Sequence, residues 1–356
     1  MKAETVSALH DFTLEARELL EKEISEQLEG IYGLLPNGRL EPIEKYPALK
    51  ELPEAKETRN RLGQFLEDER AAGVNGKEAR EKLTKEAAFT WLNRLVAFKM
   101  MESRKLLRQT VSKGPQSNAF LRWLTEPGNE KDYDKYERGD LPQNALGEGP
   151  RHEAYRHFLL WQCDQLAQEI RVLFDPDNLA SRLCPRPLAL GHLIKKLNDQ
   201  GLKEAWLPGN EETIGWVYQS FNSEELERAF REARLSGKKF EAKDIPSVTQ
   251  LFTPRWIVRY LVENTLGRLW ADMHPDSQVM EGLEYLVPIE TTTETPHKPV
   301  REIQLLDPAC GTLHFGLVAF DLFVRMYQEE MKRAGQPGWP KTPSIENEEE
   351  IPAAVI

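Results

Sequence analysis

The sequence has little cysteine and no long hydrophobic run. Its three cysteines, Cys163, Cys184 and Cys310, are odd in number and none has CxxC spacing. This argues against a disulfide framework and against a zinc site, so no bound metal is predicted. Free thiols predict a reducing, cytoplasmic location. A run of about 18 uncharged apolar residues, the length that crosses a bilayer, does not occur either. No membrane partner is therefore expected.

Positive charge is also scarce. The chain carries 47 Lys and Arg against 58 Asp and Glu, a formal net charge of −11. Bulk charge therefore does not predict nucleic-acid binding, and a DNA-binding surface would have to be a local patch on an acidic body. Two helices are expected to carry such patches, with Arg104, Lys105 and Arg108 on one, and Arg231, Arg234, Lys238 and Lys239 on the other. A charge run is usually a solvated face, and contact with DNA phosphates is the alternative.

Strand-like alternation is almost absent from the first 240 residues. Apolar residues recur there at spacings of three and four, which places them on one face of a helix. The three series are Leu20, Ile24, Leu28, Ile31 and Leu35, then Phe89, Leu92, Val96 and Met100, then Leu159, Cys163, Leu166, Ile170 and Leu173. Residues 126–150 lack periodicity and read as a long polar connection. The pattern predicts a helical N-terminal region over residues 1–240.

The sequence pattern changes in residues 241–356, where helical periodicity is joined by a short apolar run and a glycine turn. In "LFTPRWIV", Thr253 is expected to cap a helix whose first residue is Pro254. Further on, residues 303–306 form a short apolar run typical of a buried parallel strand. The turn "DPACG" and a helix with Phe315, Val318, Leu322 and Met326 on one face follow it. A strand, a glycine turn and a helix make the opening of a βαβ unit, so we expect a mainly α region followed by the start of an α/β, Rossmann-like domain.

The turn has the residues of a nucleotide-type site. Ligands of open α/β sheets bind beyond the carboxyl ends of the strands, where Asp307 would lie. Gly311 would let the backbone approach a ligand closely. The turn is neither a dinucleotide fingerprint nor a phosphate loop, because GxGxxG and GxxxxGK[ST] are both missing. Cys310 is interpreted as a small buried residue and not as a nucleophile.

Two stretches carry a resemblance to a known family. "LFTPRWIVRYLVENTLGRLW" followed by "LLDPACGTLHFGLVAFDLF" resembles the N-terminal half of the BREX phage-defence adenine-specific DNA methyltransferases, the PglX family. Weaker likeness at "TWLNRLVAFKMME" and "IGWVYQSF" extends the resemblance in patches over roughly residues 85–325. It implies a class I methyltransferase domain, S-adenosylmethionine as the cofactor and double-stranded DNA as the substrate. It also allows other BREX defence proteins as partners.

The resemblance also implies which residues hold the cofactor. They are Phe252, Thr253, Pro254, Asp307, Pro308, Ala309, Cys310, Gly311 and Thr312. The sequence departs from the wider group at Gly311-Thr312-Leu313, where many relatives have Gly-Ser-Gly. Leu313 replaces a permissive position with a bulky one, which puts the geometry of the loop in doubt. His314 at the helix start is interpreted as structural, with ligand contact as the alternative.

One element of such an enzyme is missing. Adenine methyltransferases of this kind carry Asn/Asp-Pro-Pro-Tyr/Phe, whose polar groups bind the target amino group and whose ring stacks on the flipped base. The sequence contains neither "NPP" nor "DPP", so no catalytic residue is predicted. We expect an N-terminal portion of a longer enzyme that is inactive by itself. The alternative is a non-catalytic specificity or scaffold module that binds DNA or a partner protein.

Overall fold

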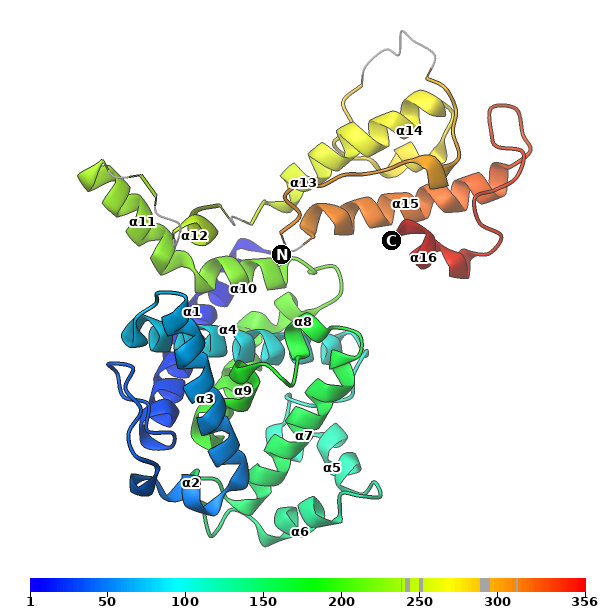
Figure 1. Ribbon diagram of the computed structural model, residues 1–356. Coiled ribbons are helices and arrows are strands. Elements are labelled where there is room, and N and C mark those ends of the chain that lie inside the picture. The colour runs from blue at the N-terminus through cyan, green and yellow to red at the C-terminus, as the bar shows by residue number, and fades with distance from the viewer. Residues whose placement is uncertain (238, 241–243, 250–251, 289–294, 312) are drawn as a thin grey trace. The chain divides into compact units, whose positions relative to one another are not determined.

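The computed structural model describes residues 1–237, 239–240, 244–249, 252–288, 295–311 and 313–356 (Figure 1). Over these ranges the chain is mainly helical, and its β-structure is limited to one isolated antiparallel bridge between Leu34 and Leu40. The chain divides into two compact units, Met1–Arg228 and Ala229–Ile356. None of the described helices is long and apolar enough to cross a membrane.

The unit Met1–Arg228 is a helical assembly around two long helices, α1 (Ala3–Gly30) and α4 (Gly76–Ser103). The shorter helices are α2 (Pro47–Glu51), α3 (Pro53–Ala71), α5 (Asn118–Leu124), α6 (Glu130–Arg138), α7 (Pro150–Ala167), α8 (Arg171–Phe174), α9 (Pro187–Leu197) and α10 (Thr213–Phe221). A further helix, α11 (Ser223–Ser236), runs across the division between the units.

The two long helices form where the apolar spacing predicts them. Leu20, Ile24 and Leu28 on α1 are completely buried, as are Leu92 and Val96 on α4. These stripes face a common core, because α1 packs against α4, α9 and α10. The helical stripes predicted from the sequence are confirmed at these positions.

The predicted polar loop over residues 126–150 is partly wrong, because α6 forms inside it. The helix is held by contacts that lie far away in the sequence. Asp132 lies 2.7 Å from the His157 ring nitrogen, and Lys135 donates to Glu153 at 2.7 Å. Tyr136 packs its ring against Phe120, with centroids 5.8 Å apart. A segment without apolar periodicity is helical here because tertiary contacts stabilise it.

An ion-pair cluster joins α11 to α1 and α4. The Arg17 guanidinium on α1 donates to both carboxylate oxygens of Glu225, at 2.8 and 2.6 Å, and to the Phe221 carbonyl. Lys85 on α4 lies 2.8 Å from the same carboxylate. Burial alone would raise the pKa of Glu225, but the hydrogen bonds from Arg17 and Lys85 outweigh it and lower the pKa to about 2. The carboxylate is therefore charged at neutral pH.

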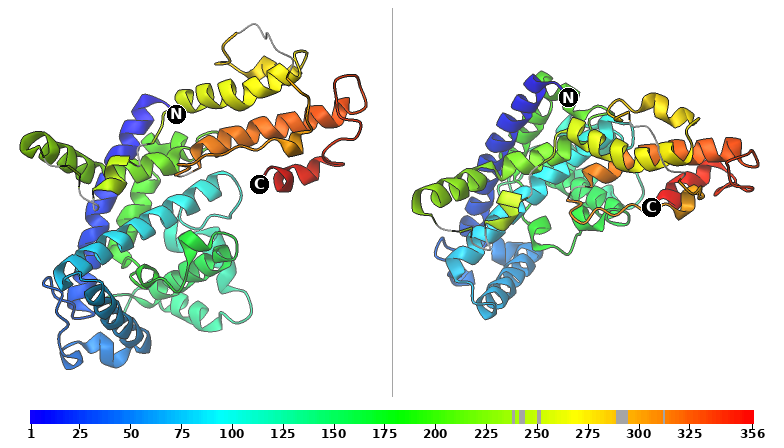
Figure 2. Two further views of the ribbon diagram at one scale, coloured as in Figure 1. Left: turned by 45° about the horizontal axis from the view of Figure 1, so that its top comes forward. Right: turned by 90° about the horizontal axis from the view of Figure 1, so that it is seen from above.

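The unit Ala229–Ile356 is built on two helices that run side by side in every view (Figure 2). The first is continuous through α13 (Arg255–Val262), a π-helical turn (Glu263–Gly267) and α14 (Arg268–Met273). The second is α15 (His314–Arg333). Two short helices, α12 (Ile245–Thr249) and α16 (Ile351–Val355), complete the unit. Its core is formed by residues such as Val258, Trp270 and Met326.

The buried strand predicted at residues 303–306 is not formed. Ile303 is buried, but Leu305 and Leu306 are 42% and 85% exposed. A parallel strand needs a neighbouring strand to satisfy its backbone hydrogen bonds, and the described part of this unit contains none. The chain is therefore mainly helical over the residues that the structure describes, and the predicted start of a Rossmann-like sheet is not seen among them.

Candidate functional site

The two segments that resemble methyltransferase motifs meet in the structure. The rings of Phe252 and His314 stack with centroids 4.4 Å apart and an interplanar angle of 15°. Phe252 precedes α13, whereas His314 is the buried first residue of α15. The contact brings the Phe-Thr-Pro segment next to the helix that follows the Asp-Pro-Ala-Cys-Gly turn. His314 thus packs within the protein through this stack, and its interpretation as structural, with ligand contact as the alternative, stays a prediction.

The predicted cap of α13 is wrong by one residue. Pro254, with φ −54° and ψ 139°, occupies the N-cap position and the helix begins at Arg255. No side chain at that cap accepts a hydrogen bond, so Thr253 does not cap the helix. A ψ near 139° is extended, and this directs the chain into the helix one residue later than the sequence pattern indicates. Thr253 is half-buried and Pro254 is exposed.

The Asp-Pro-Ala-Cys-Gly segment forms a tight turn with an exposed tip. Asp307 Oδ1 accepts a hydrogen bond from the Ala309 N–H at 3.0 Å, and the Leu313 N–H donates to the Cys310 carbonyl at 2.7 Å. Pro308, Ala309, Cys310 and Gly311 are exposed. The prediction that Cys310 is buried is therefore wrong, because the residue lies at the tip of the turn instead of beneath it. Thr312 lies outside the described residues.

The two carboxylate oxygens of Asp307 differ in their hydrogen bonding. Oδ2 is buried and has no hydrogen-bond partner among the residues that the structure describes. A buried oxygen of this kind normally has a donor.

Two residues of the turn have left-handed backbones. Gly311 has φ +50°, and a Cβ added to it would meet nothing closer than the Ala309 carbonyl at 3.9 Å. Leu313 has φ +61° and ψ 27°, the conformation that glycine adopts most easily. The chain therefore keeps a glycine-type backbone where many relatives of the wider group have glycine. The Leu313 side chain lies against Gly316, where an added Cβ would be 2.7 Å from Leu313 Cγ.

Two acidic residues that the sequence patterns did not reveal hold the segments around α15 in place. Glu330 is 1% exposed and accepts hydrogen bonds from the N–H groups of Val300 and Ser344, both at 2.7 Å. Its neighbour Glu329 accepts from the Gln278 N–H at 2.7 Å. Acidic residues on a helix are usually assigned to its solvent face, which is why sequence reasoning missed them. Glu330 positions the chain that leads into the turn.

The residues present fit part of an S-adenosylmethionine site. Asp307 offers a carboxylate oxygen, Gly311 leaves space for close approach, and the exposed tip leaves its backbone accessible. No group of three or more potential metal ligands occurs within the described ranges.

Comparison with known proteins agrees with the sequence motifs. The chain is 34% identical over 272 residues to the adenine-specific methyltransferase BrxX of Escherichia coli O9:H4 (strain HS), which covers 71% of this chain and 22% of that protein. It is 33% identical over 283 residues to the adenine-specific methyltransferase PglX of Lacticaseibacillus casei (strain Zhang), covering 71% and 23%. The predicted resemblance to the PglX family is confirmed. The chain spans less than a quarter of the length of these adenine-specific methyltransferases. No family model matches it.

The predicted basic patches are only partly as expected. Arg104, Lys105 and Arg108 do not lie on one helix, because α4 ends at Ser103. Arg104 is also engaged within the protein, since it pairs with Glu211 at 3.5 Å. Arg231 and Arg234 are exposed on α11, as is Lys239 beyond the end of that helix. Lys238 lies outside the described residues.

Proposed function

We propose that the chain is the N-terminal part of a site-specific DNA adenine-N6 methyltransferase of the BREX type, which uses S-adenosylmethionine and acts on double-stranded DNA. The similarity to two adenine-specific methyltransferases carries this proposal. The stacking of Phe252 on His314 supports it, because it brings together the two segments that would share the cofactor. In this proposal residues 241–356 begin the methyltransferase domain, and the helical region before them contacts DNA or a partner protein.

The cofactor would supply an electrophilic methyl group. Asp307 would accept a hydrogen bond from it through Oδ2, and the space at Gly311 would let the backbone approach it. Phe252, Thr253 and Pro254 would line the methionyl end, and Pro308, Ala309, Cys310 and Thr312 would complete the turn. Because the exocyclic nitrogen of adenine would accept the methyl group directly, Cys310 would have no covalent role.

Catalysis itself would depend on residues outside this sequence. The element that binds a flipped adenine, Asn/Asp-Pro-Pro-Tyr/Phe, does not occur in it. We therefore propose that residues 1–356 alone do not transfer a methyl group, whereas the complete polypeptide methylates adenine N6.

The test is mass spectrometry of nucleosides from DNA exposed to the complete polypeptide, to residues 1–356 and to the Cys310→Ala variant of the complete polypeptide. We expect N6-methyladenine from the first and the third only. Methylcytosine from the complete polypeptide would contradict the assignment to adenine. Methyladenine from residues 1–356 would contradict the division of the active site.

The missing catalytic element also favours a second candidate, a non-catalytic specificity or scaffold module. The reading frame distinguishes the two. An Asn-Pro-Pro-Tyr/Phe element encoded after Ile356 in the same frame supports the enzyme, whereas a stop codon at that point supports the module or an enzyme split between two chains.

A further inference from the structure

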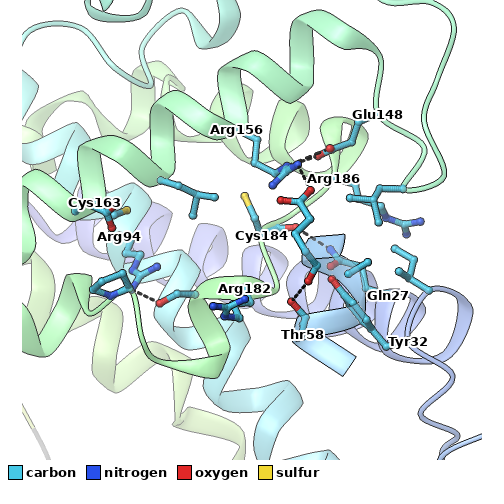
Figure 3. A pocket seen from close by; sticks show the side chains of 18 residues that line it. Gln27, Tyr32, Thr58, Arg94, Glu148, Arg156, Cys163, Arg182, Cys184 and Arg186 are labelled. Carbon is cyan, nitrogen blue, oxygen red and sulfur yellow. Dashed lines mark hydrogen bonds and ion pairs between the residues drawn. The ribbon is translucent and has the colours of Figure 1, made fainter. Parts of the chain in front are cut away.

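The unit Met1–Arg228 contains a pocket with an unusual charge arrangement. It has a volume of about 260 Å³ and opens among α1, α3, α4 and α7 (Figure 3). Four arginines line it, Arg94, Arg156, Arg182 and Arg186, together with the buried thiols of Cys163 and Cys184. Four guanidinium groups around one pocket require an explanation, because buried positive charges are normally neutralised.

Three of the four arginines are neutralised by carboxylates of the same unit. The shortest contacts are Arg156 with Glu148 and with Glu54, each at 3.0 Å, Arg186 with Glu23 at 2.7 Å and with Glu26 at 3.0 Å, and Arg182 with Glu57 at 2.8 Å. These pairs account for the charge of Arg156, Arg182 and Arg186.

Arg94 is the exception. It is 1% exposed, and no ion pair joins it to a carboxylate in the part of the chain that the structure describes. Its Nε donates to the Leu173 carbonyl at 2.9 Å, and its Nη2 donates to Ser181 Oγ at 2.7 Å. Nη1 is buried without a hydrogen-bond partner among the described residues. Burial lowers the pKa of Arg94, and the nearby Asp175 and Asp164 carboxylates offset this effect only in part.

A second donor on the pocket wall is also unused. Arg182 Nε is buried and unpartnered among the described residues, although the Nη2 of the same side chain pairs with Glu57. The two thiols do not supply a negative charge instead, because burial raises the pKa of Cys163 to about 12 and that of Cys184 further. The pocket wall thus contains two guanidinium N–H groups, Arg94 Nη1 and Arg182 Nε, that have no hydrogen-bond partner among the described residues, and it also contains the carboxylate of Asp164.

We propose that this pocket binds a small oxyanion, a phosphate or carboxylate group on a metabolite-sized molecule, through Arg94 Nη1 and Arg182 Nε. Guanidinium groups match the oxygens of both anions and form strong charge-assisted hydrogen bonds with them. The volume of about 260 Å³ lies just below the ~300 Å³ at which pockets for drug-sized ligands begin. Ile31, Leu146 and Leu160 on the wall provide apolar contact for an organic part. The proposal is independent of the proposed methyltransferase function.

Calorimetric titration of the 356-residue chain with inorganic phosphate and with acetate tests the proposal, with chloride at equal ionic strength as the reference. We expect saturable binding of at least one of the two anions. Binding of phosphate alone identifies a phosphate-bearing ligand, and binding of acetate alone identifies a carboxylate. Saturation is the criterion, because phosphate also stabilises proteins generally by exclusion from their surface.

Arg182→Gln is the decisive variant, and Arg61→Gln is its matched control. Both arginines pair with Glu57, Arg182 at 2.8 Å and Arg61 at 3.3 Å, but Arg182 lines the pocket and Arg61 does not. We expect Arg182→Gln to weaken anion binding by about tenfold, the effect of losing one charge-assisted hydrogen bond. Arg61→Gln should leave affinity unchanged.

A second variant tests Arg94 itself. Arg94→Lys keeps the charge and removes the planar fork, so we expect weaker anion binding in it as well. Arg94 also donates hydrogen bonds to the Leu173 carbonyl and to Ser181, so the folding of the Arg94→Lys variant is checked by circular dichroism. If that variant does not fold, Arg182→Gln decides the question. The proposal is overturned if neither anion binds saturably, or if Arg61→Gln and Arg182→Gln weaken binding equally.

Discussion

Leu313, like Lys105, is a non-glycine residue with a left-handed backbone conformation. It adopts φ +61°, and its side chain is 53% exposed, so little packing offsets the strain. A left-handed conformation costs an L-residue about 1–2 kcal/mol, while glycine loses roughly 0.5–1 kcal/mol more chain entropy on folding. We predict that Leu313→Gly stabilises the unit Ala229–Ile356 by about 0.5 kcal/mol, measured by urea denaturation. A clear loss of stability would contradict this.

The same residue determines what Gly316 tolerates. In the wild-type chain an added Cβ would lie 2.7 Å from Leu313 Cγ, so Gly316→Ala must displace that side chain. In the Leu313→Gly background the obstacle is gone and alanine is the better helix former. Gly316→Ala is therefore expected to be more favourable in the double variant than alone. Equal effects in the two backgrounds would show that the contact does not matter.

Among the elements, α11 is joined to α1 and α4 through the carboxylate of Glu225. Glu225 forms ion pairs with Arg17 of α1 and Lys85 of α4, and these pairs lower its pKa from the ordinary value of 4.5 to about 2. A depressed pKa stabilises the folded state above pH 4.5, and that stabilisation is lost as the pH falls from 4.5 toward about 2. We predict that Glu225→Gln costs about 2 kcal/mol at pH 7 and much less at pH 3.

Glu224→Gln is the control for this prediction. Its carboxylate lies 3.7 Å from Arg17, but its side chain is 70% exposed, so it should change stability by less than about 0.5 kcal/mol. Urea denaturation at pH 7 and pH 3 measures both variants. A loss in Glu225→Gln that does not depend on pH would contradict the ion-pair explanation.

The stack of Phe252 on His314 joins the segment before α13 to the start of α15. Stacked aromatic pairs contribute about 0.5–1.5 kcal/mol beyond their buried area. A double-mutant cycle with Phe252→Leu and His314→Leu should therefore give a coupling energy in that range, from urea denaturation of the four proteins. A coupling below about 0.3 kcal/mol is within the additivity of independent sites and would mean that the stack does not join them.

Prediction from sequence succeeds where local pattern determines structure. The apolar stripes of α1 and α4 are predicted by spacing, because one face of each helix must be buried. It fails where long-range contacts decide, as at α6, where Asp132 and Lys135 bond to α7. It also fails at Leu305 and Leu306, because an apolar run becomes a strand only beside another strand. At the candidate site, the sequence motifs predicted which two segments lie together. They did not predict the left-handed backbone of Leu313 or the hydrogen bonds of Glu330, because both depend on the three-dimensional structure.

At the scale of the whole molecule, the function to be tested is that of the Asp-Pro-Ala-Cys-Gly turn at residues 307–311. The chain covers less than a quarter of two adenine-specific methyltransferases that it resembles, and the proposed cofactor residues lie in its second unit. In the proposed function a cofactor would occupy the open space at Gly311 and contact Asp307, whose Oδ2 has no hydrogen-bond partner among the described residues.

Calorimetric titration of the complete polypeptide with S-adenosylmethionine tests this claim most directly. Gly311→Val places a side chain in the open space, and Asp307→Ala removes the carboxylate. Gly335→Val is the control, because Gly335 also has a positive φ and an added Cβ there would also meet only a carbonyl at 3.9 Å, but at the far end of α15. We predict that Gly311→Val and Asp307→Ala weaken binding at least tenfold while Gly335→Val retains it. Unchanged affinity in both Gly311→Val and Asp307→Ala would contradict it.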